Sequence, residues 1–302
     1  MTTGRQAAAQ RNRNSLFVED GEIISVAVHP GDQFIQRIRA PKCAAEARAG
    51  SFVHIGCDVA LPMRRPMSIM RVGEDWIEVL YKIVGDGLRL LSKKQPGDRV
   101  SLLGPIGVPF TPDPERPKQL LIGGGVGIPP MVFLADALRK EPAWQVLAIL
   151  GSEIPFPFEL HRSSIPVAGI DPGVSSAMRL LEDWGIPSRL TSLQGYDGCF
   201  NGYVTDLADQ WLASLAKEDL DQVSVFACGP TVMLNAVADL AARYALPCQV
   251  SLEEFMACAV GGCAGCTVLV NTPDGQAMKR VCVDGPVFDA SMVVWSVQGN
   301  AR

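Results

Sequence analysis

The sequence predicts a multidomain β plus α/β protein with three parts: an antiparallel β domain, a parallel-sheet α/β domain and a small C-terminal module rich in cysteine. Residues 17–103 contain short β-rich runs separated by turns, residues 119–252 alternate strands with helices, and four spaced cysteines follow within residues 258–282. Short strands at close spacing are typical of a small antiparallel barrel or sandwich. Alternating strands and helices indicate a parallel sheet with crossover helices.

The composition excludes several classes of function. A net charge of −5 in 302 residues argues against a nucleic-acid partner, which requires a basic surface. The charge-free stretch 119–135 contains four glycines and two prolines, which suits a strand, a glycine loop and a helix start, and the charge-free stretch 255–273 carries three of the cysteines. Neither composition suits a membrane span. Residues 1–14 are polar and basic without an apolar core, so no signal peptide is expected and the chain is predicted to be cytoplasmic. The three histidines form no recognisable ligand or triad pattern, which leaves hydrolytic chemistry unsupported.

The first domain is expected over residues 15–112. Its strands are predicted at residues 23–28, 33–39, 51–55, 67–71, 76–83 and 99–103. One helical piece, residues 87–94, interrupts them before the turn at residues 95–98. The pattern favours an antiparallel barrel.

The second domain is expected over residues 113–252, after a proline-rich link. Strands are predicted at residues 119–122, 145–150, 189–192, 223–227 and 249–252. One helix is predicted to follow the glycine loop after the first strand and to end near residue 139. Three more are predicted at residues 174–184, 205–216 and 231–244. Residues 155–173 are proline-rich and are expected to form a long surface loop. The cysteine module takes the remainder, residues 253–302.

Cys258, Cys263, Cys266 and Cys282 form a C-x4-C-x2-C run followed by one distant cysteine. This is the spacing with which plant-type ferredoxins hold a [2Fe–2S] cluster. The intervening glycines allow backbone N–H groups to turn towards the cluster sulfurs. A tetrahedral zinc site is the main alternative, although only Cys263 and Cys266 form a short ligand pair. A disulfide pair would suit a secreted protein, and no secretion signal is visible.

Two stretches of the α/β domain are candidates for nucleotide binding. One follows a buried strand and contains Gly123, Gly124, Gly125 and Gly127; the other ends a later strand with Cys228, Gly229 and Pro230. Glycines allow backbone N–H groups to approach a phosphate closely. Glycine-rich turns also serve close helix–sheet packing, so neither stretch alone is specific. Both end parallel strands, which places them at the edge of the sheet where ligands bind.

Two stretches of the β domain carry polar groups next to glycines. Arg65-Pro66-Met67-Ser68-Ile69 places a guanidinium and a hydroxyl on one strand. A second stretch runs from Tyr81 into a helix through Gly85 and Gly87. Spacing alone leaves open a surface arginine and an ordinary strand–helix turn.

The order of these motifs resembles the ferredoxin-reductase superfamily. The order is R-P-M-S-I, strand–G-x-G–helix, L-G-P-x-G, G-G-G-V-G-x-P-P, A-C-G-P and the cysteine run. More closely, it resembles the electron-transfer subunits of NAD-dependent dihydroorotate dehydrogenases. The resemblance extends over residues 17 to 290 and includes the tail at residues 280–288 and the stretch 201–206. The combination is far more specific than any single motif.

The resemblance implies three cofactors: FAD in the β domain, NAD(H) in the α/β domain and a [2Fe–2S] cluster in the cysteine module. Arg65 would neutralise flavin phosphate, Pro66 and Met67 would pack along the flavin, and Ser68 would bond near its reactive nitrogen. The strand–helix stretch, with Tyr81, Gly85 and Gly87, would approach the FAD pyrophosphate. The nicotinamide nucleotide would lie on Gly123, Gly124, Gly125, Gly127, Cys228, Gly229 and Pro230. Ser68 and Cys228 would lie nearest the reacting atoms.

The implied function is electron transfer between a nicotinamide nucleotide, FAD and the cluster. The resemblance implies that the partner is a dihydroorotate dehydrogenase catalytic flavoprotein subunit of pyrimidine biosynthesis, in a hetero-oligomer without nucleic acid or membrane. Two alternatives stay open. The partner could be a ferredoxin, a hydrogenase or a sulfite-reducing subunit, or the chain could be a redox sensor whose cluster reports rather than conducts.

Three departures from the family pattern concern details of this scheme. Leu88 stands where relatives usually have threonine, and Ala259 follows the first cysteine where glycine is more usual, which predicts strain in one turn. The 155–173 loop is longer than in relatives. For the nucleotide, Glu153 after the second strand favours NADH, although Arg162 in the long loop could accommodate the extra phosphate of NADPH.

Overall fold

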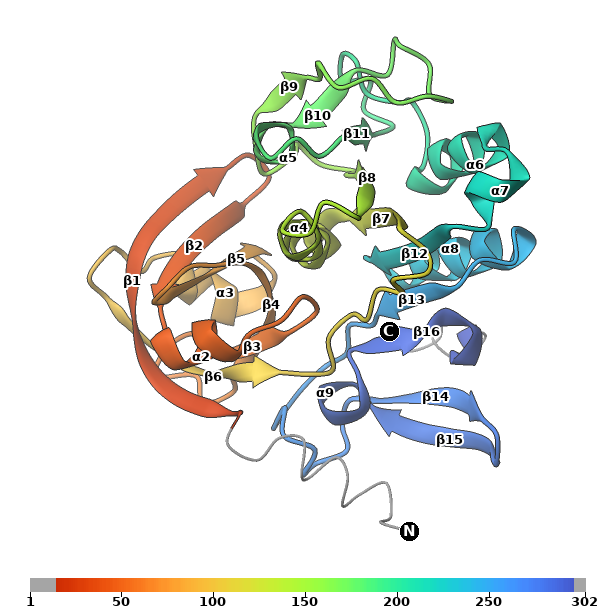
Figure 1. Ribbon diagram of the computed structural model, residues 1–302. Coiled ribbons are helices and arrows are strands. Elements are labelled where there is room, and N and C mark those ends of the chain that lie inside the picture. The colour runs from red at the N-terminus through yellow and green to blue at the C-terminus, as the bar shows by residue number, and fades with distance from the viewer. Residues whose placement is uncertain (1–14, 296–302) are drawn as a thin grey trace.

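A computed structural model describes residues 15–295 and arranges them as a closed barrel, a six-stranded sheet and a C-terminal hairpin (Figure 1). Residues 1–14, predicted to lack a signal peptide, lie outside the described part. The predicted combination of an antiparallel barrel, a parallel α/β sheet and a small C-terminal module is confirmed.

The barrel closes in the strand order β1-β2-β5-β4-β3-β6 with antiparallel neighbours. Its strands are β1 (Phe17–His29), β2 (Gln33–Arg39), β3 (Phe52–Gly56), β4 (Arg65–Val72), β5 (Trp76–Lys82) and β6 (Arg99–Ile106). Closure leaves no free strand edge. Inside it, alternate residues such as Ile23, Ile38 and Ile77 are fully buried, as expected for strands with one face towards a core.

Two short helices lie between strands of the barrel: α2 (Pro41–Glu46) and α3 (Gly85–Leu91). The sequence predicted α3 within residues 87–94 and missed α2. The start of α2 depends on a residue far away in the chain, because the Glu19 carboxylate accepts the backbone N–H groups of Lys42 (3.1 Å) and Cys43 (2.8 Å). Such a tertiary cap leaves no local signature.

The α/β sheet has the strand order β11-β8-β7-β12-β13-β16. The first five strands are parallel: β7 (Lys118–Gly124), β8 (Gln145–Gly151), β11 (Ser188–Thr191), β12 (Val223–Cys228) and β13 (Cys248–Ser251). β16 (Val287–Asp289) runs antiparallel at one edge. β7 and β12 are largely apolar and buried on both faces, which is typical of a parallel sheet covered on both sides.

Helices cover both faces of this sheet. The face towards the barrel carries α4 (Ile128–Leu138) and α5 (Arg179–Asp183), whose buried side chains share one hydrophobic cluster with Leu121 of β7 and with the barrel. The opposite face carries α6 (Val204–Ser214) and α8 (Thr231–Arg243), which pack with Leu120 and Ile122 in a second cluster. A short α7 (Lys217–Leu220) precedes β12. Figure 1 shows α4 between the barrel and the sheet.

The cysteine module is a hairpin with a short helix. β14 (Thr267–Thr272) pairs with β15 (Gly275–Arg280), and α9 (Val281–Asp284) follows. The chain then returns to the α/β sheet as β16, followed by the 3₁₀ turn η2 (Ala290–Met292). The predicted domain boundaries stay predictions, but the segment after residue 253 is joined to the α/β sheet through this strand.

The region between β8 and β11 differs from the sequence prediction. Instead of one loop and one helix over residues 174–184, the chain forms β9 (Leu160–Arg162), its antiparallel partner β10 (Ser176–Met178) and the five-residue α5. Backbone N–H groups of Ser175 and Ser176 both donate to the Gly198 carbonyl at 2.8 Å. Long-range pairing of this kind overrides the local helical pattern.

Candidate functional site

On the barrel, the Arg65 guanidinium lies against the start of α3. A methyl group at Gly87 would be 3.1–3.2 Å from Nε, Cζ and Nη2 of Arg65. Nη1 donates to the carbonyls of Met63 (2.9 Å) and Arg64 (3.2 Å), while Nε and Nη2 meet no protein acceptor within residues 15–295. Gly85 beside them has φ +72 and open space around its Cα. A fixed guanidinium with two free donors beside accessible backbone fits a phosphate group.

Pro66, Met67 and Ser68 follow Arg65 along β4, and their side chains alternate across the strand. Met67 is buried in the barrel cluster, whereas Pro66 and Ser68 are half-buried on the other face. The Met67 side chain is therefore part of the core. Pro66 and Ser68 face outward, where the edge of a bound flavin would contact them.

Tyr81 contributes an unsatisfied polar group. Its ring stacks on Phe34 with centroids 5.4 Å apart, the side chain is buried, and the hydroxyl has no hydrogen-bond partner in the described chain. Burial raises the pKa of Tyr81, so the hydroxyl remains protonated. Buried hydroxyls nearly always find a partner, and a bound cofactor would supply one here.

The glycine-rich loop on the α/β side serves two purposes. β7 leads into the 3₁₀ turn η1 (Gly125–Gly127) and then α4. A Cβ at Gly127 would lie 2.1 Å from the Cys228 carbonyl oxygen, and one at Gly124 would lie 2.4 Å from the Met233 sulfur. Gly123 and Gly229 are also closely packed. Gly125 alone has φ +54 and nothing within 4 Å. It is the glycine of this loop with room for a phosphate.

The Cys228-Gly229-Pro230 stretch lies beside this loop. β12 pairs with β7 so that Cys228 is opposite Gly123, and α8 starts after Pro230. The Cys228 side chain is fully buried, and burial together with the charge of Glu253 raises the pKa of its thiol. The thiol is therefore neutral at physiological pH.

Glu253 is a further candidate at this sheet edge that the sequence did not reveal. β13 pairs with β12 so that Ser251 is opposite Cys228, and Glu253 follows two residues later at the same sheet edge. Its side chain is accessible to solvent, yet the surrounding protein raises the pKa of the carboxyl to about 7 by desolvation. The rule that ligands bind at the carboxyl ends of parallel strands would have pointed to it.

The barrel and the nucleotide loop meet directly. α4 packs against β4, and η1 contacts β5. The strand that carries Arg65, Pro66 and Ser68 is therefore next to the element that follows Gly125. A flavin on β4 would have the nucleotide loop beside it.

The four cysteines are arranged as two pairs. The hairpin brings Cys266, just before β14, next to Cys282 in α9, with sulfurs 3.3 Å apart and the Val281 N–H donating to the Cys266 carbonyl (2.9 Å). Cys258 and Cys263 form the other pair, in which the Cys263 N–H donates to the Cys258 sulfur (3.4 Å). The Gly265 N–H donates likewise to the Cys263 sulfur (3.4 Å).

The two cysteine pairs match the ligand arrangement of a cluster with two irons. Within residues 15–295, no three histidine, cysteine, aspartate or glutamate side chains converge on one point as a mononuclear metal site requires. A [2Fe–2S] cluster needs two thiolates on each iron, which the pairs supply. Burial raises the pKa of Cys258, but hydrogen bonds, chiefly from the backbone of Cys263, outweigh burial and lower this pKa to about 7. Thiolate formation at this position is thereby eased.

The cysteine segment meets the barrel at β3, where the Met256 backbone lies against His54, and just after β6, where the Val108 N–H donates to the Gly285 carbonyl (2.6 Å). Phe52 and Ile106 of β3 and β6 share a hydrophobic cluster with Ala259 and Cys266. His54, also on β3, is fully buried, and its ring lies against the backbone of Arg64 and Met256. Burial lowers the pKa of His54 to about 4. His54 lies opposite Pro66 in the pairing of β3 with β4, so one strand spacing separates the cysteine side from the flavin side.

No helix within the described residues is both long and apolar enough to span a bilayer.

Comparisons with known proteins agree with this arrangement. Residues 253–294 match the family described as the iron-sulfur cluster binding domain of dihydroorotate dehydrogenase B. The chain is 31% identical over 285 residues to the electron transfer subunit of dihydroorotate dehydrogenase B (NAD(+)) from Desulforamulus reducens, covering 92% of this chain and 98% of that one. The corresponding subunit from Bacillus mycoides is 32% identical over 295 residues, covering 94% and 99%.

Solved structures show the same fold. The structure of an NADH-dependent reduced ferredoxin-NADP oxidoreductase, which concerns flavin-based electron bifurcation, matches with a TM-score of 0.72 and 28% identity, covering 92% of this chain and 91% of that one. A ferredoxin NADP+ reductase from Neisseria gonorrhoeae with bound FAD and NADP matches with a TM-score of 0.56 at 16% identity, covering 75% and 91%. The latter likeness concerns the fold alone.

Proposed function

The chain belongs to the family of electron transfer subunits of dihydroorotate dehydrogenase B (NAD(+)), and from this we propose that it is an oxidoreductase subunit that exchanges electrons between NAD(H) and a dihydroorotate-oxidising partner through FAD and a [2Fe–2S] cluster. The observation that carries the proposal is the position of β4. On one side β4 contacts α4, the helix that follows the nucleotide loop. On the other side β4 pairs with β3, which lies beside the cysteine segment.

When bound, a flavin supplies the exchange between two-electron hydride transfer and one-electron transfer that joins NAD(H) to an iron–sulfur centre. The residues of this chain hold and orient the groups. Arg65 and the backbone at Gly85 and Gly87 would hold the FAD phosphates. Pro66 and Ser68, with the Tyr81 hydroxyl, contact the remainder of the cofactor, and Met67 supports them from the core.

A bound nicotinamide nucleotide would be held by residues at the carboxyl edge of the sheet. Gly125 admits its phosphate, while Gly123, Gly124, Gly127 and the Cys228-Gly229-Pro230 stretch set the shape of the loop. Cys228 and Glu253 lie at the nicotinamide end, where Glu253, with a pKa of about 7, is a group that holds a proton near neutrality. Cys258, Cys263, Cys266 and Cys282 ligate the cluster.

The partner is a dihydroorotate dehydrogenase catalytic flavoprotein subunit, in a cytoplasmic hetero-oligomer that serves pyrimidine biosynthesis. Co-expression of this chain with a catalytic subunit of that type tests the proposal. The two should purify together, and the complex should reduce NAD+ with dihydroorotate as electron donor. A stable FAD- and iron-containing chain that neither binds such a subunit nor supports this reaction would contradict it.

One second candidate has a specific observation in its favour. The structural match with a TM-score of 0.72 is to a protein described as an NADH-dependent reduced ferredoxin-NADP oxidoreductase, which favours a ferredoxin as the alternative electron partner. Reduction of ferredoxin by the isolated chain with NADH, at a rate above that of the dihydroorotate reaction, would support this candidate.

A further inference from the structure

Arg280, the last residue of β15, reaches back to the loop that carries the first two cysteines of the run. Its Nη1 donates to the Gly261 carbonyl (3.0 Å), and a Cβ at Gly261 would lie 3.2 Å from the same nitrogen. Gly261 lies between Cys258 and Cys263 and has φ +81, so a residue with a side chain would be strained there and would crowd the guanidinium. The positive charge of Arg280 is therefore fixed beside the cysteine loop.

Asp284 in α9 holds Arg280 in this position. One carboxylate oxygen, Oδ2, accepts the Arg280 backbone N–H (2.8 Å) and lies 3.6 Å from Arg280 Nε. The two side chains are 28% and 23% exposed, so solvent screens the pair only in part. It is the only ion pair among residues 253–295, and Cys282 lies between its two members along the chain.

The peptide group between Gly261 and Gly262 connects Arg280 to Cys258. Its carbonyl accepts from Arg280, and its N–H, at Gly262, is one of the backbone donors that lower the pKa of Cys258 against the effect of burial. A donor on the carbonyl polarises a peptide group and strengthens its N–H as a donor. Burial raises the pKa of Cys282, and the N–H of Gly261 opposes this rise. The backbone that Arg280 holds thus acts on one cysteine of each pair.

The charges of Arg280 and Asp284 bear on reduction of a cluster held by these cysteines. Hydrogen bonds to the sulfurs and the net charge set the reduction potential of an iron–sulfur cluster. Reduction adds one negative charge, so a nearby cation favours the reduced form and a nearby anion disfavours it. The Arg280–Asp284 pair supplies one charge of each sign.

We propose that Arg280 is a positioning residue that raises the reduction potential of the cluster, and that Asp284 is the counter-charge that limits this rise. The inference rests on the proposed function, in which the four cysteines ligate a [2Fe–2S] cluster. The step affected is the transfer of one electron from reduced flavin to the oxidised cluster, in which no bond to this chain forms or breaks. The two side chains therefore set how electrons are shared between the two cofactors.

The test is an anaerobic redox titration of the full chain with FAD bound, in which the reduced cluster is followed by electron paramagnetic resonance. Arg280→Gln removes the cation, so the ratio of reduced to oxidised cluster at a given solution potential should fall at least threefold, equivalent to about 28 mV for one electron. Asp284→Asn removes the anion and should raise this ratio at least threefold. Arg280→Lys keeps a cationic N–H donor and should stay within twofold of wild type.

Lys279→Gln is the matched control. It removes the same charge from the neighbouring residue of β15, whose side chain lies on the other face of the strand from that of Arg280, and should change the ratio less than twofold.

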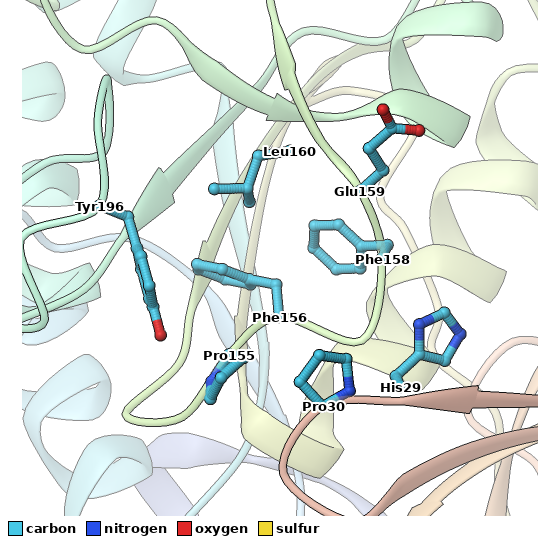
Figure 2. Close-up of a pocket in the computed structure, with 8 residues that line it drawn as sticks. All are labelled: His29, Pro30, Pro155, Phe156, Phe158, Glu159, Leu160 and Tyr196. Carbon is cyan, nitrogen blue, oxygen red and sulfur yellow. The ribbon is translucent and has the colours of Figure 1, made fainter.

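NADH oxidation provides a second control. β15 lies at the opposite end of the molecule from β9 and from the aromatic cleft that Phe156, Phe158 and Tyr196 form beside it (Figure 1 and Figure 2). Substitutions on β15 should leave this part of the α/β domain unchanged. The KM for NADH, measured with a dye that takes electrons from the flavin, should therefore stay the same in all four variants.

Opposite shifts for Arg280→Gln and Asp284→Asn are the result that a purely structural brace would not give, because loss of either member would loosen the same loop. If both variants keep the cluster and their ratios move in the same direction, or stay within twofold of wild type, the proposal is wrong. A ratio for Arg280→Lys as low as that for Arg280→Gln would also overturn it.

The proposal stays testable if a variant loses iron. If one of Arg280→Gln and Asp284→Asn loses the cluster, the other decides by the sign of its shift, and loss from both shows a structural brace and overturns the proposal. A wild-type chain without a [2Fe–2S] cluster would contradict the proposed function itself. A wild-type cluster whose potential neither substitution moves would contradict this inference alone.

Discussion

At the scale of single residues, the cysteine segment contains backbone that suits glycine better than the residues present. Ala259 and Ala264 have φ +56 and φ +54, and this left-handed region costs an L-residue about 1–2 kcal/mol. The expected strain at Ala259 is confirmed. Ala264 was not anticipated, because its position in a turn becomes visible only once the loop is folded around the cysteine sulfurs.

Glycine substitutions at these positions should differ in effect. Ala264 is exposed, so Ala264→Gly should stabilise the cluster-containing fold by about 0.5–1 kcal/mol after the entropy that glycine gains in the unfolded chain. Ala259 is 1% exposed, and loss of its buried methyl group, worth about 0.8 kcal/mol, should cancel most of the gain. Urea unfolding followed by the cluster absorbance measures both. Equal stabilisation by the two changes would refute the role given to burial.

Glu253 predicts a pH dependence of stability. The carboxyl has a pKa of about 7 in the folded chain against 4.5 as its ordinary value, so the folded state holds this proton between these pH values and the unfolded state does not. This contribution to stability is therefore lost as the pH rises from 4.5 to 7.

Glu253→Gln should remove this dependence. Compared with wild type, the variant should become more stable as the pH rises from about 5 to about 8. The difference should be less than about 1 kcal/mol, since the side chain is exposed and solvent screens its charge. Denaturant midpoints of both proteins at the two pH values provide the measurement. A difference between variant and wild type that does not change with pH would show that Glu253 titrates normally.

At the scale of elements, local patterns predicted most strands and helices, and long-range contacts explain the exceptions. The parallel strands were recognisable because β7 and β12 are largely apolar along their length. β9, β10 and α2 were missed, since their pairing and capping partners, such as Glu19 for α2, lie elsewhere in the chain. Glu253 was missed for a similar reason: it joins the site through the register between β12 and β13.

The glycine turns give a matched pair of predictions for the two nucleotides. Gly125 and Gly85 both have positive φ, and a Cβ added at either would meet no atom within 4 Å, so an alanine at either costs the same backbone strain of about 1–2 kcal/mol. Gly125→Ala should raise the KM for NADH with FAD content unchanged. Gly85→Ala should weaken FAD binding with the cluster intact.

Comparison of these two variants with a third one separates the loss of a ligand contact from the loss of packing. Gly127→Ala is the comparison for packing, because its Cβ would overlap the Cys228 carbonyl, and it should lower the stability of the whole chain. If each of the variants Gly125→Ala and Gly85→Ala lowers the affinities for both NADH and FAD to the same extent, neither glycine borders the phosphate assigned to it. The same conclusion follows if the two variants only destabilise the protein.

At the scale of the whole molecule, the order of motifs along the chain predicted the set of sites but not their mutual positions. Cys266 and Cys282 were recognised from spacing, and the β14–β15 hairpin explains how 15 intervening residues return the chain to the same point. The packing of the cysteine segment on β3, and the burial of His54 there, depend on tertiary contacts. These contacts place the cysteine segment beside β3, the strand that pairs with β4, which is the basis of the proposed electron path.

Cys266→Ser tests this path most directly. Serine is a poor substitute for a soft thiolate ligand, so the variant should lose the cluster, while FAD content stays near one per chain and NADH still reduces a dye that takes electrons from the flavin. Retained FAD is the control, because loss of the metal could also unfold the segment.

The decisive measurement is the rate of dihydroorotate-dependent NAD+ reduction by the complex of Cys266→Ser with its catalytic partner. This rate should collapse while NADH-dependent dye reduction persists. A complex with full FAD, no cluster and an undiminished rate would contradict the route through the cysteine module.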